Sequence, residues 1–351
     1  FLRHIVHRWA FTLLVLGLAG AAIYQINQRL PAGFIPAEDQ GMIYAILQTP
    51  PGSTLERTFA KSTELQRIAR VVPRRGVTPR NLAFVRRMSA LAGRPVAMST
   101  RGVVTCDVMV PGPTGAPDVR VRLYRPAGST EPVPALLWIH GGGFLIGTAR
   151  QDERSNIDMV RELGIAVASV DYRLAPEHPF PAPAEDCYAA LRWLHAAAPA
   201  FGIRSDRIAV GGASAGGGLA AGVALMAHDR GEVPLAFQLL VYPMLDDRTV
   251  QRARGDESDF RLWNSTCNEF GWRSYLGAMP GGPEVSPYAA PARRVDLGGL
   301  APAWLGVGTL DLFHDEDVDY ATRLREAGVA CDLVEVDGAF HGFDGLAPRA
   351  P

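Results

Sequence analysis

The chain has 351 residues, enough for one large domain with an appendage or for two modest domains. Hydrophobic residues make up 48% of it and charged residues 20%, so a sizeable packed core is expected and disorder is not. The formal net charge of −1 lacks the basic surplus typical of nucleic-acid-binding proteins, which argues against a nucleic-acid partner.

An almost wholly apolar segment covers residues 9–26. It lies at the lower limit for crossing a bilayer, which needs roughly 20 residues, and Arg3 and Arg8 before it favour a cytoplasmic N-terminus. Two alternatives stay open: a signal peptide cleaved near the small residues 19–21, and a buried helix. Membrane contact is expected only through residues 5–26.

The segment that follows predicts a loop, a strand over residues 42–48 and a helix over 55–69. The helix start is indicated by Ser53 and Glu56, which form a capping box because each side chain satisfies an unpaired amide of the first turn. With the motif L-P-x-x-F-x-P-x-E-D-Q-G at residues 30–41, this part resembles a fragment of a resistance–nodulation–division efflux pump. Such pumps are far longer, so transport is not expected. A fusion is the favoured interpretation, and a recruited membrane anchor is the alternative.

A Pro-, Gly- and Arg-rich stretch at residues 71–79 predicts a domain boundary. We therefore expect a pump-like part at residues 1–75 and a second domain at 76–351, the latter starting with a short helix over 81–92.

From residue 119 onward, short apolar runs alternate with helical stretches. Residues 119–124 alternate with period two, which is typical of a half-exposed strand, and the continuous apolar runs 135–139 and 165–170 are typical of buried parallel strands. The sequence predicts further strands at 207–210, 235–242, 303–308 and 331–336, and helices at 156–163, 183–198 and 219–227. This alternation predicts a three-layer α/β fold with a mostly parallel central sheet.

The segment G-A-S-A-G at residues 212–216 lies between a predicted strand and a predicted helix. A G-x-S-x-G turn in this position forms a nucleophile elbow, because small flanking residues let the chain turn sharply and expose the serine. Ser214 is therefore the predicted nucleophile, and a plain glycine-rich turn is the alternative. Further upstream, H-G-G-G at residues 140–143 follows a predicted strand, and its backbone N–H groups are suited to stabilise an oxyanion. His140 itself is expected to be structural.

A serine nucleophile needs a base and an acid that orients the base. In this chain order the base comes last, and His341 lies in a glycine-flanked loop after the last predicted strand. The acid is expected after the strand 303–308, where Asp311 is the first choice and Asp315 the alternative. The acidic cluster at residues 314–317 is interpreted as a solvated helix start rather than a metal site.

From about residue 79, the chain resembles the hormone-sensitive-lipase-like family (bacterial family IV) of esterases. Five motifs match in order: H-G-G-G at 140–143, D-Y-R-L-A-P-E at 171–177, G-A-S-A-G-G at 212–217, D-L-F-H-D at 311–315 and F-H-G-F at 340–343. The resemblance implies an α/β-hydrolase fold with a helical cap, and no cofactor or metal. It implies a catalytic triad of Ser214, Asp311 and His341. It also implies an oxyanion hole formed by the amides of Gly142, Gly143 and Ala215. Tyr172, Arg173 and Glu177 match a motif with a mainly structural role.

The family's cap is built from N-terminal helices and an insertion after a central strand, which places cap elements near residues 79–95 and 247–282. Four aromatic residues of the insertion are candidates to line the substrate pocket, with packing of the cap core as the alternative: Trp263, Phe270, Trp272 and Tyr275. Only ten residues follow His341, where the family usually has another helix. Its loss is expected to expose apolar surface and to favour association, for example as a homodimer.

The predicted function is hydrolysis of small-molecule carboxylic esters with short to medium acyl chains. The alternatives are an amidase or lactone hydrolase that uses the same triad, or a fusion product with impaired catalysis. A receptor of the same fold is disfavoured because the base is present. The scattered cysteines predict buried free thiols: Cys106, Cys187, Cys267 and Cys331. The hydrolase domain alone predicts a cytoplasmic location, whereas a native N-terminal segment predicts membrane anchoring or export.

Overall fold

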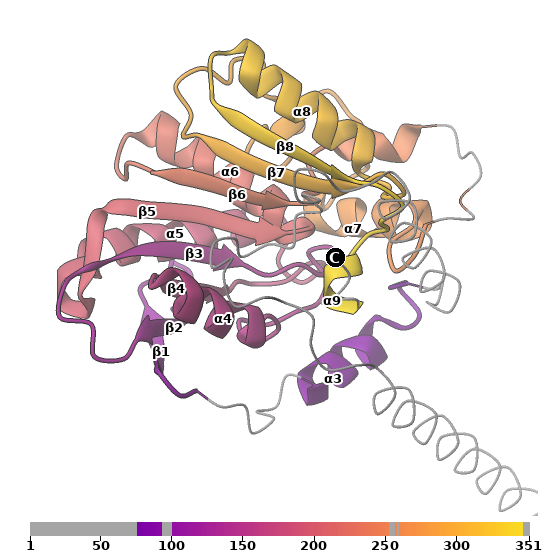
Figure 1. Cartoon of the computed structure of the whole chain (residues 1–351). Helices are drawn as coiled ribbons and strands as arrows, with labels where there is room; N and C mark the ends of the chain where they lie inside the picture. Colours follow the sequence, from indigo (N-terminus) through magenta and orange to yellow (C-terminus); the bar gives the residue numbers. More distant parts are fainter. Residues whose placement is uncertain (1–75, 93–99, 253–256, 258–259, 347–351) are drawn as a thin grey trace, which may run out of the picture. The chain divides into compact units, whose positions relative to one another are not determined.

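The computed structural model describes residues 76–92, 100–252, 257 and 260–346 (Figure 1). The pump-like segment and the predicted boundary at residue 75 lie outside these residues. Within them, no helix is both long and apolar enough to cross a membrane.

One eight-stranded sheet organises the described chain, with strand order β1-β2-β4-β3-β5-β6-β7-β8. β1 and β2 pair antiparallel, as do β2 and β4, and all other neighbours are parallel. The strands are β1 (Val103–Val110), β2 (Val119–Pro126), β3 (Val133–Ile139), β4 (Ala166–Asp171), β5 (Ile203–Ala213), β6 (Phe237–Val241), β7 (Ala303–Gly308) and β8 (Cys331–Val336). This order and the mostly parallel pairing define the α/β-hydrolase fold expected from the sequence.

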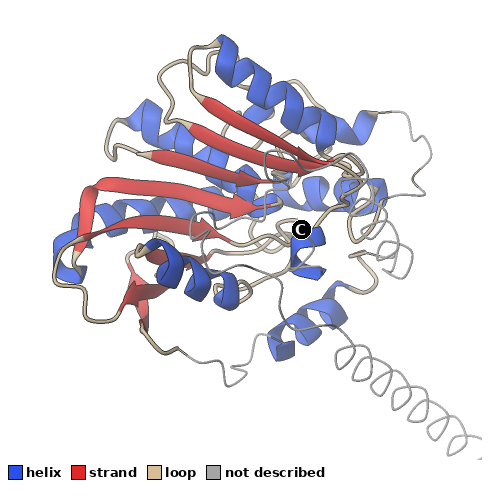
Figure 2. Ribbon diagram, in the orientation of Figure 1, coloured by secondary structure: helices blue, strands red, loops and turns tan. Residues whose placement is uncertain are grey.

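Helices flank the sheet (Figure 2). They are α3 (Leu82–Ala92), α4 (Glu153–Leu163), α5 (Ala182–Ala197), α6 (Ala215–Arg230), α7 (Ser265–Leu276), α8 (His314–Glu326) and α9 (Phe343–Leu346), with short 3-10 turns at Ala198–Phe201, Asp247–Gln251 and Pro291–Arg293. In Figure 1, α4 lies in front of the sheet, while α5 and α6 lie behind it. Helices on both faces bury the central strands on both sides, which explains the continuous apolar runs of β3 and β4.

Helix α6 packs deepest. All its residues from Ala215 to Ala227 are buried, and small side chains let it lie close to the sheet and to neighbouring loops. A Cβ added at Gly218 would lie 2.1 Å from the carbonyl oxygen of Met244, and one at Gly222 would lie 2.4 Å from that of Tyr288. Close packing of this helix fixes the position of the residue immediately before it, Ser214.

Most predicted elements are present, with some corrections. β5 starts at Ile203 rather than 207; residues 204–207 are polar and partly or fully exposed, so the sequence shows no apolar run there. Sequence reasoning missed β1, which lies at the sheet edge and lacks a continuous apolar face. It also gave no helix in the insertion, although Asn264 accepts a hydrogen bond from the Cys267 amide (3.0 Å) and caps α7.

The four cysteines are free thiols. Three are buried, as expected, but Cys106 on the edge strand β1 is only half-buried.

Candidate active site

Ser214 lies in a sharp turn between β5 and α6. Its backbone has φ 57° and ψ −124°, a conformation that non-glycine residues rarely adopt and that is typical of strained functional turns. Glycines on both sides permit this turn, because a Cβ at Gly212 would lie 2.5 Å from the Ile139 carbonyl oxygen and one at Gly216 would lie 2.1 Å from the same atom. The turn therefore has the sharp geometry expected of a nucleophile elbow.

The three predicted triad residues come together at one edge of the sheet. β5, β7 and β8 are parallel, so the loops after them lie at the same edge, towards which their arrowheads point in Figure 1. His341 Nε2 lies 2.9 Å from Ser214 Oγ, and His341 Nδ1 lies 2.8 Å from Asp311 Oδ2. All three side chains are buried. This geometry allows a proton to pass from the serine hydroxyl to an imidazole held by a carboxylate.

Further contacts hold the Asp311 carboxylate and the His341 imidazole in place. The Phe313 amide donates a hydrogen bond of 3.0 Å to Asp311 Oδ1, so the other carboxylate oxygen faces His341. The rings of Tyr242 and Phe313 pack edge-on against the imidazole, with centroids 4.8 Å and 5.2 Å away. Sequence reasoning missed both rings. For Phe313 the sequence offered one signal: it lies two residues after Asp311, and in an Asx turn the aspartate side chain accepts a hydrogen bond from the amide at that position.

The glycine loop after β3 faces the nucleophile. Gly142 and Gly143 have φ values of 117° and 61°, and a Cβ at Gly142 would lie 2.1 Å from the Ile146 carbonyl oxygen. In the described part of the chain, the amides of Gly142 and Gly143 have no hydrogen-bond acceptor. The amide of Ala215 lies in the first turn of α6, where amides lack an acceptor within the helix. Among the described residues, no acceptor is seen for the three amides predicted for the oxyanion hole.

His140, at the start of this loop, is held in place by Tyr172. It is fully buried, its ring stacks on that of Tyr172 with centroids 4.3 Å apart, and the Tyr172 hydroxyl donates to the His140 carbonyl (2.9 Å). Burial lowers the pKa of His140, so the ring is expected to be neutral. These contacts agree with the structural role expected for His140.

The D-Y-R-L-A-P-E segment also makes structural contacts. Arg173 forms an ion pair with the buried Asp186 (2.7 Å), and Glu177 pairs with Arg86 of α3 (2.7 Å). Arg86 donates as well to the carbonyl oxygens of Leu145 and Ala175. One arginine of α3 thereby ties that helix to the loop that carries the glycines.

The four aromatic candidates of the insertion occupy different places. Trp272 and Tyr275 are completely buried, and Tyr275 stacks on Phe144 with centroids 3.9 Å apart. They pack against each other and against Phe144, which follows the glycine loop, so their burial agrees with the packing alternative considered from the sequence. Phe270 is half-buried. Trp263 is buried, and its ring packs against the glycine loop: a Cβ at Gly143 would lie 1.9 Å from the ring.

The acidic cluster at the start of α8 corrects the prediction of a solvated helix start. Asp315 is exposed, but Glu316 and Asp317 are buried. Glu316 accepts hydrogen bonds from the amides of Leu245 and Asp246 and from the Thr249 hydroxyl, while burial raises its pKa to about 8. Neither carboxyl oxygen of Asp317 has a hydrogen-bond partner among the described residues.

Asp317 is expected to make the stability of the protein depend on pH. Burial raises its pKa well above the usual value, and the nearby Glu316 and Asp311 carboxylates raise it further. An unfolded aspartate ionises near pH 3.9, so unfolding releases a proton above that pH and stability falls as pH rises towards the folded pKa. Asp317→Asn removes this loss. Its advantage over wild type should grow by about 1.4 kcal/mol per pH unit in that window.

Urea unfolding between pH 4 and pH 8 measures this difference. Asp315→Asn is the matched control, because its side chain is 75% exposed. Parallel stability curves for wild type and Asp317→Asn would show that Asp317 is not held protonated in the folded state.

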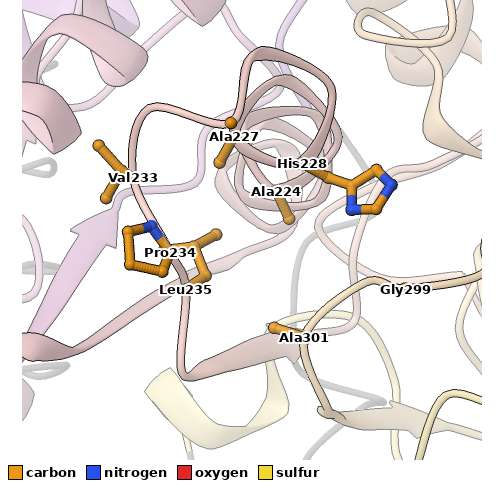
Figure 3. Close-up of a pocket in the computed structure, with 9 residues that line it drawn as sticks. Ala224, Ala227, His228, Val233, Pro234, Leu235, Gly299 and Ala301 are labelled. Carbon is orange, nitrogen blue, oxygen red and sulfur yellow. The ribbon is translucent and has the colours of Figure 1, made fainter.

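A cavity of about 470 Å³ lies away from these residues (Figure 3). Its walls are the end of α6 and the segments that lead into β6 and β7, including Ala224, Ala227, His228, Leu235 and Ala301. It thus lies at the amino ends of these strands, opposite the edge that carries Ser214. Its lining residues include no serine, cysteine or carboxylate, so it is not the catalytic centre.

Comparisons with known proteins agree with this fold and site. A family described as "alpha/beta hydrolase fold" matches residues 136–345. Carboxylic ester hydrolase LipN of Mycobacterium tuberculosis is 39% identical over 68% of this chain, which spans 63% of LipN. Esterase LipI of the same organism is 34% identical over 77% of this chain and 83% of its own length. The solved structure of a bacterial heroin esterase has a TM-score of 0.75 and 43% identity, covering 82% of this chain and 92% of that one.

The fold, the site and these relatives define a carboxylic ester hydrolase. The chain belongs to the hormone-sensitive-lipase-like family of α/β hydrolases.

Proposed function

We propose that this chain is a serine carboxylesterase for esters with short to medium acyl chains, and that it acts through an acyl-enzyme on Ser214. The observation that carries the proposal is the continuous set of contacts from Asp311 through His341 to Ser214, with distances of 2.8 Å and 2.9 Å. A serine, a base and an orienting acid in this geometry are the parts that acyl transfer requires.

The first half-reaction forms the acyl-enzyme. Ser214 Oγ attacks the ester carbonyl carbon while His341 Nε2 takes the hydroxyl proton. Asp311 keeps the other imidazole proton on Nδ1 and stabilises the imidazolium. The carbonyl oxygen becomes an oxyanion that accepts hydrogen bonds from the amides of Gly142, Gly143 and Ala215. The tetrahedral intermediate then collapses, and His341 gives its proton to the departing alcohol oxygen.

The second half-reaction releases the acid. His341 Nε2, neutral again, takes a proton from water, and the resulting nucleophile attacks the acyl carbon. The same amides hold the second oxyanion, and the proton returns to Ser214 Oγ as the carboxylic acid leaves.

The cap core supports a preference for shorter acyl chains. Trp272 and Tyr275 are fully buried against Phe144, so side chains fill the space directly behind the oxyanion loop. We infer that a long acyl chain would need that space.

Hydrolysis of p-nitrophenyl esters from acetate to palmitate by the intact chain tests the proposal. We expect kcat/KM to be highest for acyl chains of up to about eight carbons and to fall steeply towards palmitate, since added methylenes find no apolar pocket. Rapid mixing should show a burst of p-nitrophenol when deacylation limits turnover. Highest activity on palmitate, or cleavage of matched anilides but not of esters, would contradict the proposal.

A further inference from the structure

Leu262 has an unusual backbone and an exposed side chain. Its φ is 60°, and the Trp263 amide donates to the Arg261 carbonyl at 2.6 Å, so the three residues form a γ-turn with Leu262 at its apex. This conformation is strained for a bulky residue. Arg261 and Trp263 on either side are buried, whereas Leu262 is 37% exposed. The turn therefore pushes one apolar side chain outward between two anchored residues.

The γ-turn contacts both halves of the catalytic machinery. On one side, the Trp263 ring lies against Gly143 of the oxyanion loop and Gly271 of α7, where a Cβ would lie 1.9 Å and 3.1 Å from the indole. On the other side, Leu262 Cδ1 covers Gly342, the residue after His341, at 3.2 Å from the position of a Cβ there. Two consecutive residues thus span from the oxyanion loop to the loop of the catalytic base.

The chemistry of ester cleavage distinguishes these two sides. The oxyanion must lie at the glycine amides, while the departing alcohol oxygen must lie within reach of His341 Nε2, which protonates it. The alcohol group of the substrate therefore extends past the loop of His341, where Leu262 lies. Trp263, packed on Gly143, lies on the side of the glycine amides.

We propose that Leu262 sets the size limit for the alcohol portion of the ester, excluding alcohols that are branched at the carbon next to the ester oxygen. The inference rests on the proposed esterase function and adds a specificity residue to it. The strained turn holds the side chain in one place, which gives it the rigidity that a size limit requires.

Two matched substrate pairs test this inference. Isopropyl acetate differs from ethyl acetate by one methyl on the alcohol carbon, and ethyl isobutyrate differs from ethyl propionate by one methyl on the acyl carbon. In Leu262→Ala, we expect the ratio of kcat/KM for isopropyl acetate to that for ethyl acetate to rise about tenfold or more, the effect of one methylene in an apolar pocket. The acyl ratio should stay unchanged.

Two further variants control for structural effects. Leu262→Gly also removes the side chain but accepts the positive φ without strain, so it should shift the alcohol ratio in the same direction. Val295→Ala, at a residue that is 93% exposed, should move neither ratio. An unchanged alcohol ratio in both Leu262 variants, or an equal change in the acyl ratio, would overturn this inference alone. If the wild type hydrolysed none of the four esters, the proposed function would be overturned, and this inference with it.

Discussion

Ser214→Ala is expected to lower kcat for p-nitrophenyl butyrate by about 10⁶-fold, the effect of removing the nucleophile from a serine hydrolase triad. The substitution removes the single atom, Oγ, that lies 2.9 Å from His341 Nε2 and would form the covalent intermediate. The oxyanion amides remain, so residual hydrolysis about 10³- to 10⁴-fold above the uncatalysed rate is expected. Steady-state kinetics at high enzyme concentration measure both quantities.

The fold should survive this change, because the turn is held by backbone bonds. The Ser214 amide donates to the Val241 carbonyl (2.9 Å), and the Ser214 carbonyl accepts from the amides of Gly218 and Met244 (both 3.0 Å). Ser129→Ala is a suitable control, since that exposed serine lies in the turn before β3, where its hydroxyl donates to the Glu131 carbonyl (2.8 Å). If Ser214→Ala kept even about one hundredth of wild-type kcat, a nucleophile other than Ser214 would be at work.

The grouping of Ser214, Asp311 and His341 could be predicted from the sequence because each lies in a short motif with a local cause. Ser214 needs small neighbours at positions 212 and 216, and the sequence has glycine at both positions. Asp311 and His341 follow strands that the sequence predicts, and the parallel pairing of these strands brings their loops to one edge. Such features depend on few residues close in sequence.

The remaining features depend on contacts between distant segments. Leu262 contacts Gly342, 80 positions further along the chain. Asp317 lies in the first turn of α8 and is buried, although the sequence predicted a solvated helix start there. An acidic residue in the first turn of a helix is usually exposed and favourable there. Only the tertiary packing of α8 against the loop after β6, where Glu316 meets the amides of Leu245 and Asp246, reverses that expectation.

Asp311→Asn is expected to lower kcat about 10⁴-fold while leaving the structure intact, because it places the imidazole in the wrong tautomer. The Phe313 amide donates to Oδ1 of residue 311, so the asparagine carbonyl oxygen will occupy that position to keep the bond. Its NH₂ group then replaces Oδ2 and donates to His341 Nδ1, 2.8 Å away. Nδ1 becomes an acceptor, the proton moves to Nε2, and Nε2 has no lone pair left to take the Ser214 proton.

Asp315→Asn separates this explanation from the alternative acid. Asp315 lies four residues later, is exposed and contacts His314 and Arg252 rather than His341. Its kcat should match wild type. Because the Phe313 amide fixes the orientation of the asparagine, KM for p-nitrophenyl butyrate should change little in Asp311→Asn, with the loss confined to kcat. A large loss in Asp315→Asn with an active Asp311→Asn would instead assign the acid to Asp315 and would mean that the carboxylate 2.8 Å from His341 does not control its tautomer.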